Sequence, residues 1–171
     1  MDWRRVVGIV LLVAALLFGL RQILPSGDPP GLVGLAEPHF VVYFSSTTDG
    51  RLMPEYRQGF GTIEERLSVL KQGPKTKGLT NMLPRGTEII GYSLDRGVLA
   101  VNFSDRLRTG HAGGSYGELL TVYGIVNSLV EAPQVEAVRI LIDGRAVDTL
   151  AGHLNLRDPL KADHSLLGQI R

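Results

Sequence analysis

One stretch of the chain matches a pattern used in nucleophilic catalysis. Residues 113–117 read Gly-Gly-Ser-Tyr-Gly, a G-x-S-x-G sequence centred on Ser115, and Asp143 and His153 follow in the order that α/β-hydrolases use. In such enzymes the serine attacks a carbonyl carbon, the histidine takes its proton and the carboxylate orients the histidine. These three residues are therefore the candidates for a hydrolase site.

The residues around Ser115 do not support this catalytic interpretation. The pattern requires a buried strand directly before the serine, but residues 106–113 (RLRTGHAG) are polar and rich in glycine. Ser115 and Glu118 instead have the spacing of a capping box, in which the serine hydroxyl accepts from the backbone N–H of Glu118. We therefore predict that Ser115 is a helix N-cap, that the chain has no catalytic residue and that it is not an enzyme.

The histidines and the lysine-containing loop do not form a clearer ligand site. His39, His111, His153 and His164 lack the i, i+4 spacing that places two imidazoles on one helical face. Residues 73–78 (GPKTKG) lack the register of a phosphate-binding loop, and the absence of cysteine excludes a thiolate metal site. We predict no metal and no cofactor.

The charge balance argues against nucleic acid as a partner. Residues 1–36 hold three basic and two acidic residues, which leaves 15 of each in the remainder of the chain. A nucleic-acid interface needs a basic surplus concentrated on one face. Two basic pairs, Lys75 with Lys77 and Arg106 with Arg108, could contact an anionic wall polymer or lipid headgroup, or could be ordinary solvated charge.

The N-terminal composition predicts a membrane anchor. Residues 6–20 are all apolar or glycine and follow Arg4 and Arg5. Extending the segment to Leu24 gives nineteen residues, enough for a spanning helix, and Arg21 can reach the headgroups. Because no small-x-small cleavage motif follows at the usual distance, we expect an uncleaved anchor over 6–24, with a cleaved signal sequence as the alternative.

The basic residues before the anchor favour a cytoplasmic N-terminus, residues 1–5, with everything after Leu24 outside the cytoplasm. Residues 25–38 contain seven Pro or Gly in fourteen positions and predict a tether. The remainder of the chain, from His39 onward, has the size of one domain.

The first half of this domain predicts a strand pair and a helix. Residues 39–45 (HFVVYFS) are rich in β-branched and aromatic side chains, and a polar turn joins them to a second strand over 52–58. Pro54 makes this second strand an edge strand or a broken one, because proline cannot donate to the ladder. Thr62 and Glu65 form a capping box for a helix that Gly73 and Pro74 end.

The second half predicts strands over 87–94, 98–103 and 135–142, and a hairpin turn at Asp143-Gly144 into residues 145–150. The dense apolar run at 98–103 indicates a strand covered on both faces. A second helix begins at Ser115 and ends at Pro133, and it should bury Leu119, Val126 and Leu129. The order α-β-β-α-β, with extra strands, predicts an α+β fold in which two helices pack on one face of a small mixed sheet.

An ordered set of short motifs across residues 39–160 resembles the GerMN domain family of sporulation and spore-germination proteins. The motifs are Tyr43-Phe44, Asp49-Gly50, Pro54-Glu55 with Arg57, residues 67–70, Gly73-Pro74, residues 83–87 (LPRGT), residues 97–104 (GVLAVNFS), Gly114-Ser115, Glu118-Leu119, residues 133–135 (PQV) and residues 142–144 (IDG). The resemblance implies a non-enzymatic α+β module outside the cytoplasmic membrane, with a core similar to ring-building motifs. It supplies no catalytic residue, and it leaves residues 161–171 as a C-terminal tail.

These observations predict a membrane-tethered interaction or assembly module of the bacterial cell envelope, connected with sporulation or spore germination. Its expected partners are other envelope proteins, a second copy of itself and peptidoglycan, with residues 75–85 and 106–114 as the binding loops. The alternative is a cell-wall hydrolase or a wall-binding accessory domain.

Overall fold

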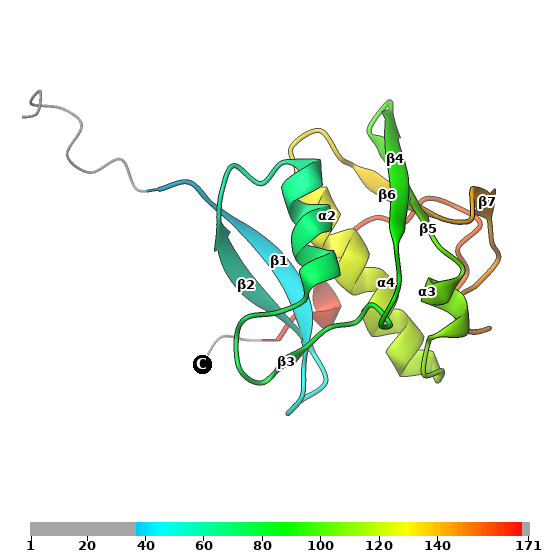
Figure 1. The fold of residues 1–171 in the computed structure, drawn as a ribbon, viewed down its shortest axis with the longest axis horizontal. Coiled ribbons are helices and arrows are strands. Elements are labelled where there is room, and N and C mark those ends of the chain that lie inside the picture. Colours follow the sequence, from blue (N-terminus) through cyan, green and yellow to red (C-terminus); the bar gives the residue numbers. More distant parts are fainter. Residues whose placement is uncertain (1–36, 169–171) are drawn as a thin grey trace, which may run out of the picture. The chain divides into compact units, whose positions relative to one another are not determined.

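Two short β-sheets and a long helix that contacts both of them make up residues 37–168, the part of the chain that this computed structural model describes (Figure 1). The predicted tail at 1–5, the anchor at 6–24 and most of the tether at 25–38 lie outside the described residues. Within residues 37–168 no helix has both the length and the apolar composition needed to cross a membrane.

The first sheet contains the predicted strand pair. Strand β1 (His39–Ser46) pairs antiparallel with β2 (Leu52–Gln58) on one side and with the two-residue β3 (Leu79–Thr80) on the other. Strand β2 is an edge strand, as its proline requires: Pro54 lies opposite Tyr43 and leaves the other side of β2 unpaired in the sheet.

The second sheet has the order β4-β5-β6-β7. Strand β4 (Ile89–Asp95) forms an antiparallel hairpin with β5 (Val98–Phe103), β5 pairs parallel with β6 (Ala137–Ile142), and β6 turns at Asp143-Gly144 into β7 (Arg145–Ala146). The α+β class is confirmed, but the prediction of one small sheet is wrong. The outer strand β2 carries Pro54, which has no N–H for a further strand, and β3 on the other side of β1 has only two residues. In residues 37–168 no strand of the first sheet pairs with a strand of the second.

Three helices connect the strands. Helix α2 (Ile63–Gln72) has the predicted capping box, since the Thr62 side chain accepts from the Glu65 N–H, and it ends at Gly73. A short helix, α3 (Arg106–Thr109), lies in a region that we predicted as loop. Helix α4 (Ser115–Val130) packs against β1, β6 and α2.

The prediction that Ser115 caps helix α4 is wrong. The capping position is Gly114, and the Glu118 N–H donates to the Gly114 carbonyl at 3.0 Å rather than to a serine hydroxyl. The Glu118 side chain is fully buried and bonds to a distant loop, so it cannot reach back to close the box. Gly114 has φ 82°, a left-handed conformation that glycine adopts without a steric cost.

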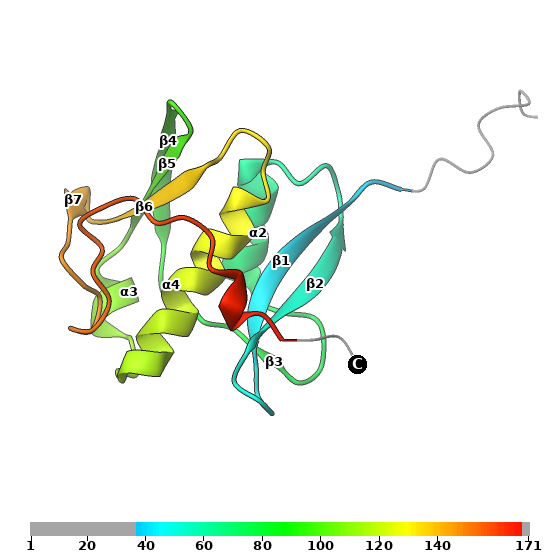
Figure 2. The same ribbon diagram turned by 180° about the vertical axis from the view of Figure 1, so that it is seen from behind.

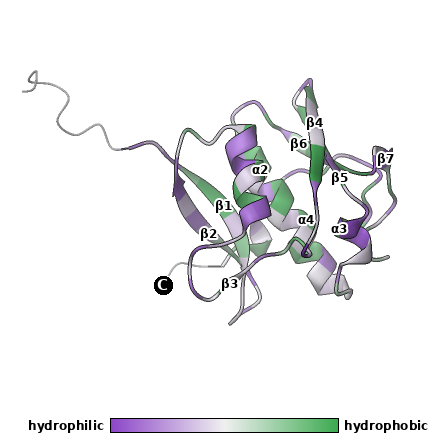
Figure 3. Cartoon of the chain, viewed as in Figure 1, coloured by the Kyte–Doolittle hydropathy of each residue, from purple (hydrophilic) through white to green (hydrophobic). Residues whose placement is uncertain are grey.

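The core lies on α4 and on the strand faces that it contacts. Val126 and Leu129 are fully buried as predicted, whereas Leu119 is only partly buried. Residues of β5 alternate between buried and half-buried, so one face of the strand is fully covered and the other, which we also predicted as covered, only in part. Figure 3 shows hydrophobic green on β1 and along parts of α4, and hydrophilic purple on α2.

The C-terminal segment packs back onto the domain. Leu160 bridges Val138, and the 3₁₀ turn η1 (His164–Leu166) lies against α4 with Leu166 buried. The N–H of Gly168 then donates to the Leu52 carbonyl at 2.8 Å. Figure 2 shows this red segment passing β6 and α4 to reach β1.

Replacing Leu129 by alanine tests the core. We expect Leu129→Ala to lower the free energy of unfolding by about 2 to 5 kcal/mol, because it opens a cavity beside α4. Ser115→Ala is the control, with an expected change within about 0.5 kcal/mol because its hydroxyl caps nothing. Urea unfolding measures both. Similar losses in the two variants would contradict this assignment of the core.

Candidate functional site

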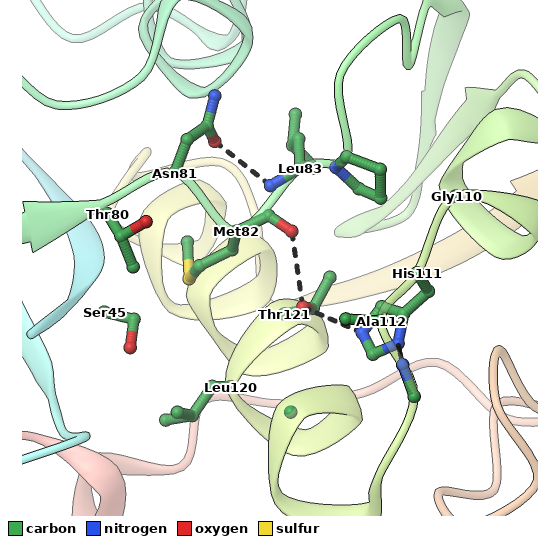
Figure 4. A pocket seen from close by; sticks show the side chains of 13 residues that line it. Ser45, Thr80, Asn81, Met82, Leu83, Gly110, His111, Ala112, Leu120 and Thr121 are labelled. Carbon is green, nitrogen blue, oxygen red and sulfur yellow. Dashed lines mark hydrogen bonds between the residues drawn. The ribbon is translucent and has the colours of Figure 1, made fainter. Parts of the chain in front are cut away.

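The two loops that the sequence marked as binding loops meet in one pocket of about 340 Å³ (Figure 4). Thr80 ends β3, residues 81–84 come from the loop after it, and residues 110–113 come from the loop between α3 and α4. Leu120 and Thr121 of α4 and Ser45 of β1 complete the walls together with Gly117. No side chain that lines the pocket is a carboxylate, an arginine or a lysine.

A buried ion pair on β2 holds the segment that leads into the first loop. The Glu55 carboxylate accepts from the backbone N–H groups of Lys75 and Thr76 at 2.9 and 2.7 Å. The Arg57 guanidinium donates to Glu55 at 2.6 Å and to the Gly73 carbonyl at 2.9 Å. Strand β2 therefore fixes the position of the segment at residues 73–76, which leads into the first loop.

These contacts also determine the ionisation of Glu55. Burial alone would raise the pKa of its carboxyl, because a charge is poorly solvated there. The hydrogen bonds from Thr76 and the Arg57 guanidinium outweigh burial and hold the pKa below its usual range. Glu55 therefore remains an anion that accepts from the loop backbone.

A chain of hydrogen bonds through His111 joins the second loop to the first. The Gly113 N–H donates to His111 Nδ1 at 3.0 Å, so the other ring nitrogen, Nε2, carries the proton. Nε2 lies 3.1 Å from the Thr121 hydroxyl, which in turn donates to the Met82 carbonyl at 3.4 Å. His111 thus bridges both loops and α4 (Figure 4).

Three polar groups on the wall are free to bind. The Ser45 side chain is 8% exposed, and among the described residues neither its hydroxyl nor that of Thr80 makes a hydrogen bond. The Asn81 side-chain oxygen accepts from the Leu83 N–H at 3.0 Å, which leaves the amide NH₂ available. The basic pairs Lys75 with Lys77 and Arg106 with Arg108 do not line the pocket.

The structure does not assemble the candidate triad. Ser115 and His153 line one small pocket, but Asp143 lines another, where its carboxylate accepts from the Asp105 N–H at 3.3 Å. His153 Nδ1 instead lies 3.2 Å from Glu118. Among the described residues Ser115 makes no hydrogen bond to His153.

From the sequence we assigned Glu118 to a capping box with Ser115, but the structure gives its carboxylate different partners. Its buried carboxylate accepts from the N–H groups of Leu150, Ala151 and His153 at 2.8 to 2.9 Å and so fixes the loop after β7. Burial alone would raise the pKa of Glu118, but the bonds from Ala151, His153 and Leu150 keep it below its usual range. In the sequence, Glu118 has helical spacing to Val122, Ile125 and Leu129, which are all buried. This spacing places Glu118 on the buried face of α4 and could have revealed its burial.

The remaining histidines are on separate elements. His39 is exposed at the start of β1 and His164 lies in η1. Across residues 37–168 no three His, Asp or Glu side chains are grouped closely enough to hold a metal ion. The absence of a cofactor stays a prediction.

Comparison with known proteins identifies one family model and several similar folds. The Germane model, described as "Sporulation and spore germination", matches residues 41–148. No curated protein matches the chain significantly.

Among solved structures, the tandem GerMN domains of the sporulation protein GerM from Bacillus subtilis align with a TM-score of 0.62 at 18% identity, over 83% of this chain and 51% of theirs. The chain thus spans about half of that tandem. The first GerMN domain alone gives a TM-score of 0.58 at 15% identity, over 74% of this chain and 98% of that one. A protein from Clostridium perfringens described as a lipoprotein gives 0.53 at 22% identity, over 79% and 93%. These similarities show a shared fold.

Glu118 should make the free energy of unfolding depend on pH. A carboxyl whose pKa is lowered by folding stabilises the protein above its unfolded pKa, and this stabilisation is lost as the pH falls through the folded pKa. This loss of stability should therefore occur below pH 4.5, the ordinary pKa of a glutamate.

In Glu118→Gln an amide NH₂ faces the loop N–H groups, so we expect a loss of about 1 to 3 kcal/mol at pH 7 and a smaller further loss at pH 4 than in the wild type. Urea unfolding at both pH values measures this. The control is Glu136→Gln, at an exposed glutamate, which should follow the wild type at both pH values. A Glu118→Gln curve that also follows the wild type would refute the assignment.

Proposed function

Because the chain belongs to the Germane family, whose model is described by sporulation and spore germination, we propose that it is a non-catalytic, membrane-tethered module that binds proteins of the bacterial cell envelope. The sporulation link comes from the family. The tether, the envelope location and the binding role are the proposal.

The observation that carries the proposal is the uncharged pocket between the two loops. Met82, Leu83 and Leu120 supply an apolar wall, while the Ser45 and Thr80 hydroxyls and the Asn81 amide supply hydrogen-bonding groups. Such a combination suits an uncharged segment of a partner protein that inserts an apolar side chain and pairs its backbone with the polar groups. A charged ligand would find no counter-charge there.

The loops are also prepared for binding before a partner arrives. Glu55 and Arg57 hold the segment that leads into the first loop, and the His111–Thr121 chain ties the second loop to α4. A loop that is already ordered loses less conformational entropy when it binds. This supports recognition by a fixed surface.

The alternative, a cell-wall hydrolase, has less support. Hydrolysis of a glycosidic bond normally uses a pair of carboxylates, and none lines this pocket. Binding of a wall glycan without hydrolysis uses the same uncharged groups and is the second candidate. Release of soluble fragments from purified peptidoglycan by the full chain would favour the hydrolase.

Blocking the pocket should remove partner binding. Ala112 is exposed at the pocket, so Ala112→Arg places a large cation in it without disturbing the core. We expect at least a tenfold loss of specifically cross-linked envelope proteins, about 1.4 kcal/mol of binding free energy, measured by quantitative mass spectrometry after isolation of the tagged chain.

The matched control for this experiment is Ala146→Arg, at an exposed alanine on β7 that does not line the pocket. This variant should recover the same proteins as the wild type. Equal recovery by Ala112→Arg would remove the pocket from the proposal.

Topology can be tested directly. Arg4 and Arg5 precede the apolar segment, so a reporter that is active only outside the cytoplasm should work when fused after Arg171 and fail when fused before Met1. Activity assays on both fusions in the producing cells give the result. The opposite pattern would reverse the proposed orientation.

A further inference from the structure

Strand β4 is a long edge strand with apolar side chains and no cover. It pairs with β5 on one side only. Ile90, Tyr92 and Leu94 are 56%, 40% and 40% exposed. Proteins normally protect such an edge, because its free N–H and C=O groups can pair with another strand.

The other sheet edges in residues 37–168 are protected. Strand β2 carries Pro54, and its Leu52 end is bridged by Leu167 of the C-terminal segment. Strands β3 and β7 have two residues each. Tyr56 and Phe60 are also exposed, but among these residues only β4 combines several exposed apolar side chains with an unprotected edge.

The hairpin turn decides which groups of β4 face outward. Arg96 and Gly97 have φ values of 46° and 80°, as in a type I′ turn, and the flanking Asp95 and Val98 are paired. Residues next to such a turn exchange hydrogen bonds, and inward and outward directions then alternate along the strand. The N–H and C=O groups of Tyr92 and Leu94 must therefore point away from β5.

A second copy of β4 matches this edge in one register. When two β4 strands run antiparallel with Tyr92 opposite Tyr92, Leu94 lies opposite Ile90, the residue at the bulge. Arg96, in the turn, and Glu88, just before the strand, then lie near each other beyond the paired residues. Within one copy these two side chains contact Asp95 and Lys71, which are exposed partners that the new contact must replace. Apolar side chains then meet apolar ones, and a cation and an anion lie close together beyond each end of the ladder. Shifting the register by two residues either way places an apolar side chain opposite a charged one.

Local contacts prepare this edge for pairing. The Tyr92 hydroxyl donates to the Glu64 carboxylate, which ties the Tyr92 side chain to α2. A bulge between Ile89 and Gly91 lies near one end of β4 and leaves regular pairing from Gly91 to Asp95. The paired segment is short, so the interface is weak by itself.

We propose that the domain forms a two-fold symmetric dimer by antiparallel pairing of β4 with β4 of a second copy. This deepens the proposed function by naming one partner, and it rests on that function only for the tether, which raises the local concentration and lets a weak interface suffice. Its surface shares no residue with the loop pocket.

Charge reversal tests the register. With the full chain purified in detergent, sedimentation velocity should show a monomer–dimer equilibrium. Arg96→Glu and Glu88→Lys should each weaken it about tenfold, since both symmetric ends become repulsive. The double variant should restore the wild-type affinity, which a merely structural effect would not do.

Arg145→Glu is the control for charge reversal, at an exposed arginine on β7, and should leave the dimer unchanged. A chain that stays monomeric at several hundred micromolar would overturn the proposal. So would a dimer whose affinity is unchanged by Arg96→Glu and Glu88→Lys. A monomer that still captures envelope proteins through the loop pocket would overturn this dimer alone and leave the proposed function standing.

Disulfide cross-linking gives an independent test, because the chain contains no cysteine. Opposed residues in a hydrogen-bonded pair have Cα atoms about 5.5 Å apart, within the range of a disulfide. Tyr92→Cys should therefore form a covalent dimer on mild oxidation of membranes that contain the full chain. Tyr56→Cys, at a more exposed edge position on β2, should not; comparable cross-linking of both would contradict β4 pairing.

Discussion

The Arg66 guanidinium lies buried where α2, β1 and the C-terminal end of α4 meet. It donates to the carbonyls of Gly61, Val41 and Ser128 at 2.6 to 3.0 Å and lies 5.3 Å from the centre of the Phe40 ring. The carbonyl groups in the last turn of α4 favour a cation at this place, because they carry the negative end of the helix dipole. This one side chain therefore sets the position of α4 relative to the first sheet, and α4 in turn supports the second sheet and the loop pocket.

The other buried ionisable side chains follow the same principle. Glu55, Arg57 and Glu118 each bond to backbone groups of segments that have little regular structure of their own. A buried charge is costly unless such partners satisfy it, so losing one member of a pair exposes the domain to a large penalty. In return, loops that would otherwise move are fixed to strands and helices, and these loops include the candidate binding surface.

The two proposed surfaces would bind different partners. The loop pocket is concave, uncharged and already ordered, which suits recognition of another protein. The β4 edge offers backbone hydrogen bonds and alternating apolar side chains, which suits a second copy. A membrane tether would serve both, since confinement compensates for the small area that a domain of this size can offer.

Local features of this domain were determined by the sequence alone. The Thr62 capping box, the helix end at Gly73, the edge position of Pro54 and the Asp143-Gly144 turn all depend on residues within a few positions of one another. The tertiary structure alone decided the division into two sheets, the meeting of residues 80–84 with 110–113, and the role of Glu118. Glu118 and Ser115 have capping-box spacing, but the partners of the Glu118 carboxylate lie more than thirty residues away, and burial on the α4 core face brings them together.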